Sequence, residues 1–179
     1  VARAQEDGSL TEEQEDFRVT RLGENVGKTG RLAPDAIDRT LTAARDFLAA
    51  IPSGGDPVAG IAAATSAVRD AHNRNAFLTP CRQLLGAGPL LLNGKDEAAI
   101  AFVGAATDQP AEAVILTVDI GGGSTEISVG RPDDCWRSCS LDLGSARLAE
   151  RFNLFDQVPR TRQEEARHAA RAMVSGQIQ

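Results

Sequence analysis

The sequence predicts an α/β fold with a mixed sheet. Apolar residues recur at spacings of three and four over residues 34–51, which is typical of an amphipathic helix. The run VILTVDI, residues 114–120, is almost continuously apolar and is typical of a buried strand. Segments of these two kinds alternate along most of the chain, and this alternation favours helices packed on a sheet.

The first half of the chain contains two predicted strands and two predicted helices. Residues 15–22 (EDFRVTRL) alternate imperfectly between apolar and polar side chains, which favours a strand. The helix over 34–51 begins with a proline, which suits a first helical turn. A small apolar run over 58–64 predicts a buried strand. Residues 73–85 predict a helix, but Pro80 removes a backbone donor in its middle, so we expect a kink or a break there.

The second half continues the alternation of short strands and helices, with a glycine turn between two of the strands. Strands are predicted at residues 89–92, 114–120, 125–129 and 136–141, and helices at 96–103, 145–152 and 162–175.

Composition narrows the class of protein. With 179 residues, of which 42% are hydrophobic, the chain is long enough to bury a core without metals or disulfides. Nineteen Lys and Arg against 25 Asp and Glu give a charge of −6, which argues against a general polyanion-binding surface and against nucleic acid as a partner. Any phosphate binding is therefore expected to be local. Six Phe, one Trp and no Tyr argue against base stacking.

Cysteine usage and hydropathy indicate a cytoplasmic protein. Cys81, Cys135 and Cys139 form an odd set without a second pair of ligands for zinc, so we interpret them as reduced thiols. No apolar run approaches the ~18 residues that span a bilayer, so we expect neither a membrane anchor nor a signal peptide.

The most informative stretch is VDIGGGSTEISVG, residues 118–130, in which a strand enters a glycine turn and resumes after two hydroxyl residues. Glycines permit positive φ and let backbone N–H groups approach phosphate oxygens closely. The candidate phosphate-binding residues are Gly121, Gly122, Gly123, Ser124 and Thr125, and the candidate ligands of Mg²⁺ or its waters are Asp119 and Glu126. The alternative is a glycine-rich hairpin with a solvated Asp. The absence of a following Lys excludes a Walker loop.

This stretch resembles the second phosphate loop of the Ppx/GppA phosphatases, which belong to the superfamily of actin, sugar kinases and heat-shock ATPases. Four further segments are similar to family segments and follow the family's order. They are RLGENVGKTGRL (21–32), ATSAVRDAHN (64–73), NGKDEA (93–98) and DLGSARLAERF (142–152). The resemblance implies an actin-like ATPase fold of the ribonuclease H type.

The resemblance also implies roles for two charged residues. It assigns Glu97 as the catalytic base, although a Glu at a helix start, taken alone, is more often a surface carboxylate that complements the helix dipole. Asp96 stands where the family usually has another Glu. The family resemblance also favours Arg69 as a bidentate phosphate contact. The alternative is an ion pair of Arg69 with Asp70 or another acid.

Four other residues have weaker signals. Arg21 and Arg147 either contact phosphate or tie a loop to the domain through a carboxylate. His72 and His168 are expected at the surface rather than as ligands.

The family's domain pattern implies a division of this chain. Residues 1–141 are expected to form a first actin-like α/β domain that lacks its first strand and first phosphate loop, with Val1 and Ala2 as the tail of a second strand. Residues 142–179 are expected to begin a second lobe. A homodimer of the full-length protein is a further expectation.

The function implied is Mg²⁺-assisted hydrolysis of a terminal phosphoanhydride. Inorganic polyphosphate is the preferred substrate, and pppGpp is the close alternative. A non-catalytic sensor of (p)ppGpp is a rival, against which the presence of Glu97 counts. A kinase of the same superfamily shares the glycine loops but is disfavoured by the segments at 64–73 and 93–98.

Overall fold

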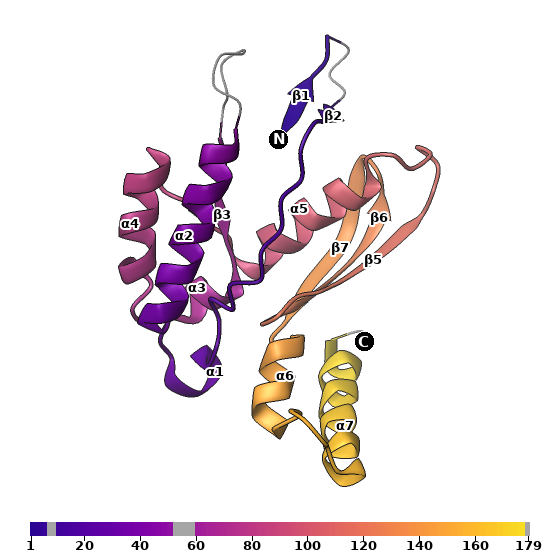
Figure 1. Ribbon diagram of the computed structural model, residues 1–179. Coiled ribbons are helices and arrows are strands. Elements are labelled where there is room, and N and C mark those ends of the chain that lie inside the picture. Colours follow the sequence, from indigo (N-terminus) through magenta and orange to yellow (C-terminus); the bar gives the residue numbers. More distant parts are fainter. Residues whose placement is uncertain (7–9, 52–59, 178–179) are drawn as a thin grey trace.

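The computed structural model describes residues 1–6, 10–51 and 60–177 and has the predicted α/β character (Figure 1). Its strands are β1 (Ala2–Ala4), β2 (Leu10–Glu12), β3 (Ala63–Ala64), β4 (Leu90–Leu91), β5 (Ile115–Ile120), β6 (Thr125–Arg131) and β7 (Asp134–Leu141). Its helices are α1 (Val26–Thr29), α2 (Pro34–Ala50), α3 (Ser66–Asp70), α4 (Asn75–Leu85), α5 (Gly94–Ala106), α6 (Ser145–Phe152) and α7 (Arg160–Gln177).

The strands form three sheets among the described residues. β1 pairs antiparallel with β2, β3 pairs parallel with β4, and β5, β6 and β7 form an antiparallel sheet in that order. Parallel and antiparallel pairing therefore both occur, but in separate sheets rather than in the one mixed sheet that was expected.

Two groups of apolar side chains hold these elements together. α2 packs beside α4 over a core in which Leu32 is 2% exposed and Phe77 is buried. α5 lies against the sheet of β5, β6 and β7 (Figure 1). It buries Ala98, Phe102 and Ala106 there, and their spacing of four residues places them on one helix face.

Several contacts join the amino-terminal elements to the carboxy-terminal ones. α1 contacts α6, and the backbone N–H of Asn25 donates to Oε1 of Glu150 at 2.8 Å. The division between residues 141 and 142 stays a prediction.

The predicted strand over residues 15–22 is wrong. Residues 15–20 form no ladder, and Phe17 and Val19 are 85% and 68% exposed. Imperfect alternation indicates which side chains share a face, but a strand also needs a neighbouring backbone to pair with. Residues 58 and 59 of the strand predicted over 58–64 lie outside the described ranges. Of the rest, only Ala63–Ala64 forms a strand, and residues 60–62 do not.

The break that was expected at Pro80 does not occur, because α4 continues through it. A proline leaves the carbonyl four residues earlier without its helical donor. That carbonyl belongs to Ala76, an exposed residue, so water can satisfy it.

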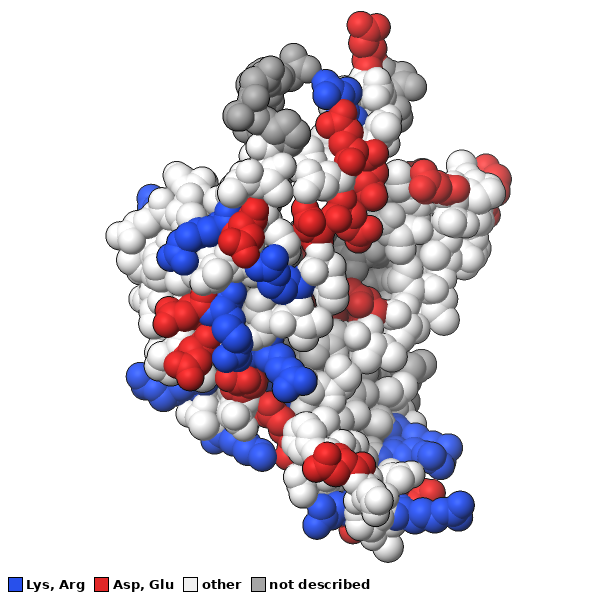
Figure 2. Space-filling model, in the orientation of Figure 1, with Lys and Arg blue, Asp and Glu red and all other residues white. Residues whose placement is uncertain are grey.

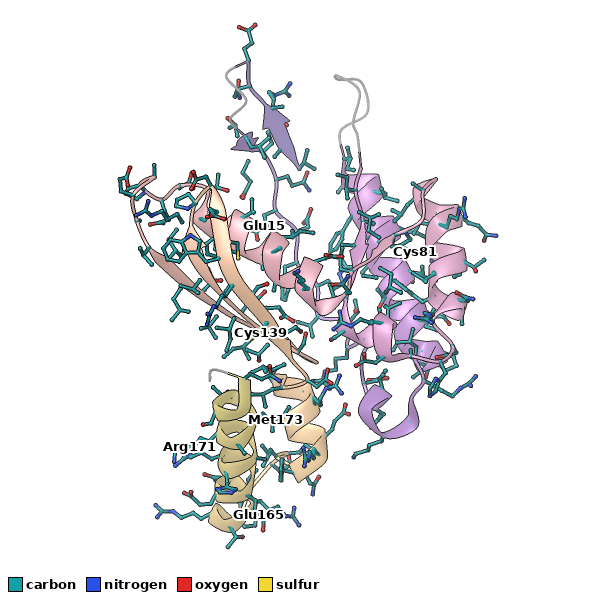
Figure 3. The ribbon with its side chains drawn as sticks, turned by 180° about the vertical axis from the view of Figure 1, so that it is seen from behind. Glu15, Cys81, Cys139, Glu165, Arg171 and Met173 are labelled. Atoms are coloured by element: carbon teal, nitrogen blue, oxygen red, sulfur yellow. The ribbon has the colours of Figure 1, made fainter. Side chains whose placement is uncertain are left out.

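The distribution of charged side chains and the state of the cysteines are as expected from the sequence. Acidic and basic side chains are interspersed on the face shown in Figure 2, which carries no continuous basic surface. Cys81 lies among the helices and Cys139 on the sheet, far apart (Figure 3), and all three cysteines are free. Burial raises the pKa of the Cys81 thiol. Within the described ranges, no helix combines the length and apolar character needed to cross a membrane.

Candidate functional site

The glycine stretch forms the turn between β5 and β6. Ile120 pairs with Thr125 at the end of the ladder, and the N–H of Gly121 donates to the carbonyl of Ser124 at 3.0 Å. The turn is therefore short and is fixed at both ends by the antiparallel pair.

The first turn of α6 binds the carbonyl groups of this turn. The N–H of Ser145 donates to Gly121 at 2.9 Å, and the N–H of Arg147 donates to Gly122 at 3.0 Å. The Nε of Arg147 donates to the carbonyl of Gly123 at 2.7 Å. The carbonyls therefore take up the free N–H groups at the start of α6, which would otherwise need capping.

The N–H groups of the turn stay available. Within the described part of the chain, those of Gly122, Gly123 and Ser124 donate to no acceptor. Ser124 is 2% exposed, and its hydroxyl has no hydrogen-bond partner among these residues. Successive free N–H groups in a turn form a concave site for an anion. The hydroxyl of Thr125, in contrast, donates to the carbonyl of Leu143 and so is already committed.

Gly123 is needed for close approach rather than for an unusual dihedral angle. The turn does not use the positive φ that glycine permits, because among the described glycines only Gly30 and Gly86 have it. A Cβ on Gly123 would lie 2.3 Å from Oγ of Ser66, where no atom fits. The first residue of α3 is thus packed directly on the turn.

The two candidate metal ligands lie opposite each other on neighbouring strands. Asp119 of β5 pairs with Glu126 of β6, so their side chains leave the same face of the sheet. Asp119 is exposed, whereas Glu126 is 3% exposed and accepts a hydrogen bond from Oγ of Ser140 at 2.7 Å. No group of three or more potential metal ligands occurs in the described ranges.

Glu97 lies in the first turn of α5. Asn93 caps this helix by accepting from the N–H groups of Lys95 and Asp96, each at 3.0 Å, and its amide donates to the Asp96 carboxylate. Gly94 packs against Ser140, since a Cβ there would lie 2.5 Å from the serine Cβ. Ser140 is the residue that binds Glu126, so the first turn of α5 lies beside the carboxylates of the sheet.

Arg69 is directed at Glu97. Its Nη1 donates to Oε2 of Glu97 and to the carbonyl of Leu92, each at 2.9 Å. The side chains of Arg69 and Glu97 are 22% and 15% exposed, so the ion pair is partly shielded from water. The structure thus brings together the two charged residues that the family segments indicated, in the ion pair given as the alternative for Arg69.

Asp70 continues this chain of charges to the glycine turn. Its carboxylate accepts a hydrogen bond from Nη2 of Arg147 and lies 3.9 Å from Nε of Arg69. Glu97, Arg69, Asp70 and Arg147 therefore form a row that ends on the carbonyl of Gly123. Arg147 has the loop-tying role that was one of its two interpretations.

Sequence reasoning did not single out Ser66 and Asp70 as parts of the site. Their spacing of four places them on one face of α3, but a helix of five residues is too short to be recognised from its sequence pattern. Arg21, His72 and His168 are exposed, as expected for the two histidines, and Cys135 and Cys139 are partly buried on β7.

Comparison with known proteins gives a consistent result. The sequence matches the profile of the Ppx/GppA phosphatase family over residues 1–179. It is 38% identical over 151 residues to exopolyphosphatase 2 of Mycobacterium tuberculosis, covering 80% of this chain and 46% of that protein. It is 34% identical over 142 residues to a bifunctional 3-dehydroquinate synthase/phosphatase of Fusobacterium nucleatum, covering 78% of this chain and 21% of that protein.

Solved structures that are similar to this chain come from the same family. An exopolyphosphatase-like protein is similar with a TM-score of 0.88 and 34% identity, over 98% of this chain and 56% of the other. A Ppx/GppA family member from Aquifex aeolicus is similar with a TM-score of 0.70 and 30% identity, over 92% of this chain and 53% of the other. The chain thus spans about half the length, or less, of the proteins that it matches.

Proposed function

The chain belongs to the Ppx/GppA phosphatase family, and we propose that the gene product carrying it hydrolyses the terminal phosphoanhydride of inorganic polyphosphate. One observation carries this proposal. A turn with three free N–H groups lies beside the helix start that presents Glu97, and Arg69 links that carboxylate to the element packed on the turn.

In the proposed reaction the turn binds the terminal phosphoryl group. The N–H groups of Gly122, Gly123 and Ser124 donate to its oxygens and stabilise the charge that builds up during transfer. Glu97 orients a water molecule and accepts its proton as the water attacks phosphorus. The bond from the terminal phosphorus to the bridging oxygen breaks, and the shortened polyphosphate leaves with that oxygen. Arg69 supplies positive charge next to Glu97 and the phosphoryl group. Its guanidinium can bind phosphate as readily as it binds carboxylate.

The opposed carboxylates Asp119 and Glu126 fit a Mg²⁺ ion. This ion is usually held by one or two carboxylates, with substrate phosphates and water completing its coordination. The facing carboxylates of Asp119 and Glu126 at the end of the glycine turn match that donor set. A closed site of three or more protein ligands does not occur among the described residues, and Mg²⁺ does not require one. A bound Mg²⁺ neutralises phosphate charge.

Polyphosphate is placed before pppGpp because of what surrounds the turn. None of the site residues described above is aromatic, so they offer no ring on which guanine can stack. Exopolyphosphatase is also the name of the mycobacterial relative. The second candidate substrate, pppGpp, presents a similar terminal phosphoanhydride, and the family includes phosphatases of both kinds.

The test is phosphate release by the complete gene product from polyphosphate and from pppGpp, each with Mg²⁺ and with EDTA. We expect release from polyphosphate that EDTA abolishes and that Asp119→Asn lowers by at least ~10-fold. Faster release from pppGpp than from polyphosphate would make pppGpp the preferred substrate and polyphosphate the alternative. Binding of pppGpp without release from either substrate would favour a sensor and overturn the proposed hydrolysis.

A further inference from the structure

Ser66 lies at the meeting point of α3 and the glycine turn. It is the first residue of α3 and is 5% exposed. Its Oγ is so close to Gly123 that a Cβ on that glycine would lie only 2.3 Å away. The hydroxyl therefore contacts the part of the turn that offers free N–H groups.

The hydroxyl of Ser66 has no hydrogen-bond partner in the described part of the chain. No completely buried side-chain oxygen in these ranges lacks a partner, so Oγ must keep some contact with solvent although the residue is almost buried. The same reasoning applies to Ser124, which is 2% exposed. Two nearly buried serines from distant segments thus keep uncommitted hydroxyls at one turn.

Ser66 and Ser124 differ in this respect from Thr125 and Ser128, the other two buried hydroxyl residues of this region. Thr125 donates to Leu143, and Ser128 donates to the carbonyl of Ala98 at 3.3 Å. A buried hydroxyl that packing alone required would be expected to bond to the protein in the same way, because leaving such a group unpaired is destabilising.

We propose that Ser66 is a further phosphate-binding residue, whose hydroxyl donates to the terminal phosphoryl group held by the turn. This inference rests on the proposed function, because it needs a phosphoryl group at Gly122, Gly123 and Ser124. The ligand is a tetrahedral phosphate oxyanion, whose oxygens accept from several directions at once. Three of the donors come from the turn between β5 and β6, and Ser66 donates from α3.

The test measures binding of inorganic pyrophosphate with Mg²⁺ by titration calorimetry, using the full chain. We expect Ser66→Ala to weaken binding about tenfold, the effect of losing one hydrogen bond to a charged group. Ser66→Cys fills the same space with a weak donor, so it is expected to weaken binding similarly without leaving a cavity. Ser175→Ala, an exposed position on α7, is the matched control and is expected to bind like the unsubstituted chain.

The possible results separate the two proposals. Unchanged pyrophosphate affinity in Ser66→Ala and Ser66→Cys would overturn the role of Ser66 alone. No binding by the unsubstituted chain would overturn both the role of Ser66 and the phosphate site on which it rests. Urea unfolding without ligand is measured in parallel, and a Ser66→Cys variant that is as stable as the unsubstituted chain but binds weakly supports the proposal.

Discussion

At the scale of single residues, the site depends on how closely α3 and the glycine turn approach each other. Gly123 leaves no room for a side chain, because Ser66 occupies the space that a Cβ would fill. Gly144 is similarly constrained, since a Cβ there would lie 2.3 Å from the carbonyl oxygen of Gly122. The requirement for glycine at both positions is therefore steric.

We expect Gly123→Ala to lower the free energy of unfolding by about 1–3 kcal/mol, the usual effect of forcing an atom into a packed site. Urea unfolding followed by circular dichroism measures this. Adding Ser66→Ala removes the nearest clashing atom and is expected to recover part of the loss. An unchanged urea midpoint in Gly123→Ala would mean that the turn and α3 are not in contact.

Several residues of the candidate site could be predicted from sequence because they have strong chemical signatures. The glycines after Asp119 indicated an anion site, and the family segment around Glu97 indicated that this carboxylate is the catalytic base. Ser66 and Asp70 could not be found in this way, because their importance comes from contacts with residues far along the chain. Asp70 bonds to Arg147, which is 77 positions away.

At the scale of elements, α3 connects the glycine turn with the start of α5. Ser66 and Asp70 are four residues apart and contact the turn and Arg147, while Arg69 reaches Glu97. A helix of five residues has little stability of its own, so these contacts must hold it in place.

A double-mutant cycle on Asp70 and Arg147 tests this connection. Their side chains are 31% and 29% exposed, so partial solvent screening reduces the coupling energy that we expect to about 1 kcal/mol. It is measured from urea unfolding of Asp70→Ala, Arg147→Ala and the double variant. Glu164 and Arg167, a pair on α7 that is 69% and 58% exposed, are the control and should couple more weakly. Equal coupling in both pairs would contradict the bridging role of α3.

The elements that sequence predicted well have long, regular patterns. The helix predicted over 34–51 is α2, and the helix predicted over 145–152 is α6. The short helices α1 and α3 were not predicted, since four or five residues are too few to show a period. The strand expected over 15–22 was wrong because a sequence pattern does not reveal whether a pairing partner is present.

At the scale of the whole molecule, the site is assembled from segments that lie far apart in sequence. α3, the first turn of α5, the turn between β5 and β6 and the first turn of α6 each contribute residues to it. All four segments lie within this chain, which covers 46% of the mycobacterial exopolyphosphatase. The residues proposed to bind phosphate and to activate water are therefore already adjacent in this structure.

The measurement that tests this account most directly is phosphate release from polyphosphate by the complete gene product and its Glu97→Gln variant. We predict a decrease of at least ~10²-fold, as expected for the loss of a general base, with pyrophosphate binding retained. Asp96→Asn is the control, because the Asp96 side chain accepts from Asn93 and is exposed; its rate should stay within about threefold. A Glu97→Gln variant that releases phosphate as fast as the unsubstituted protein would contradict the assignment of Glu97 as the base.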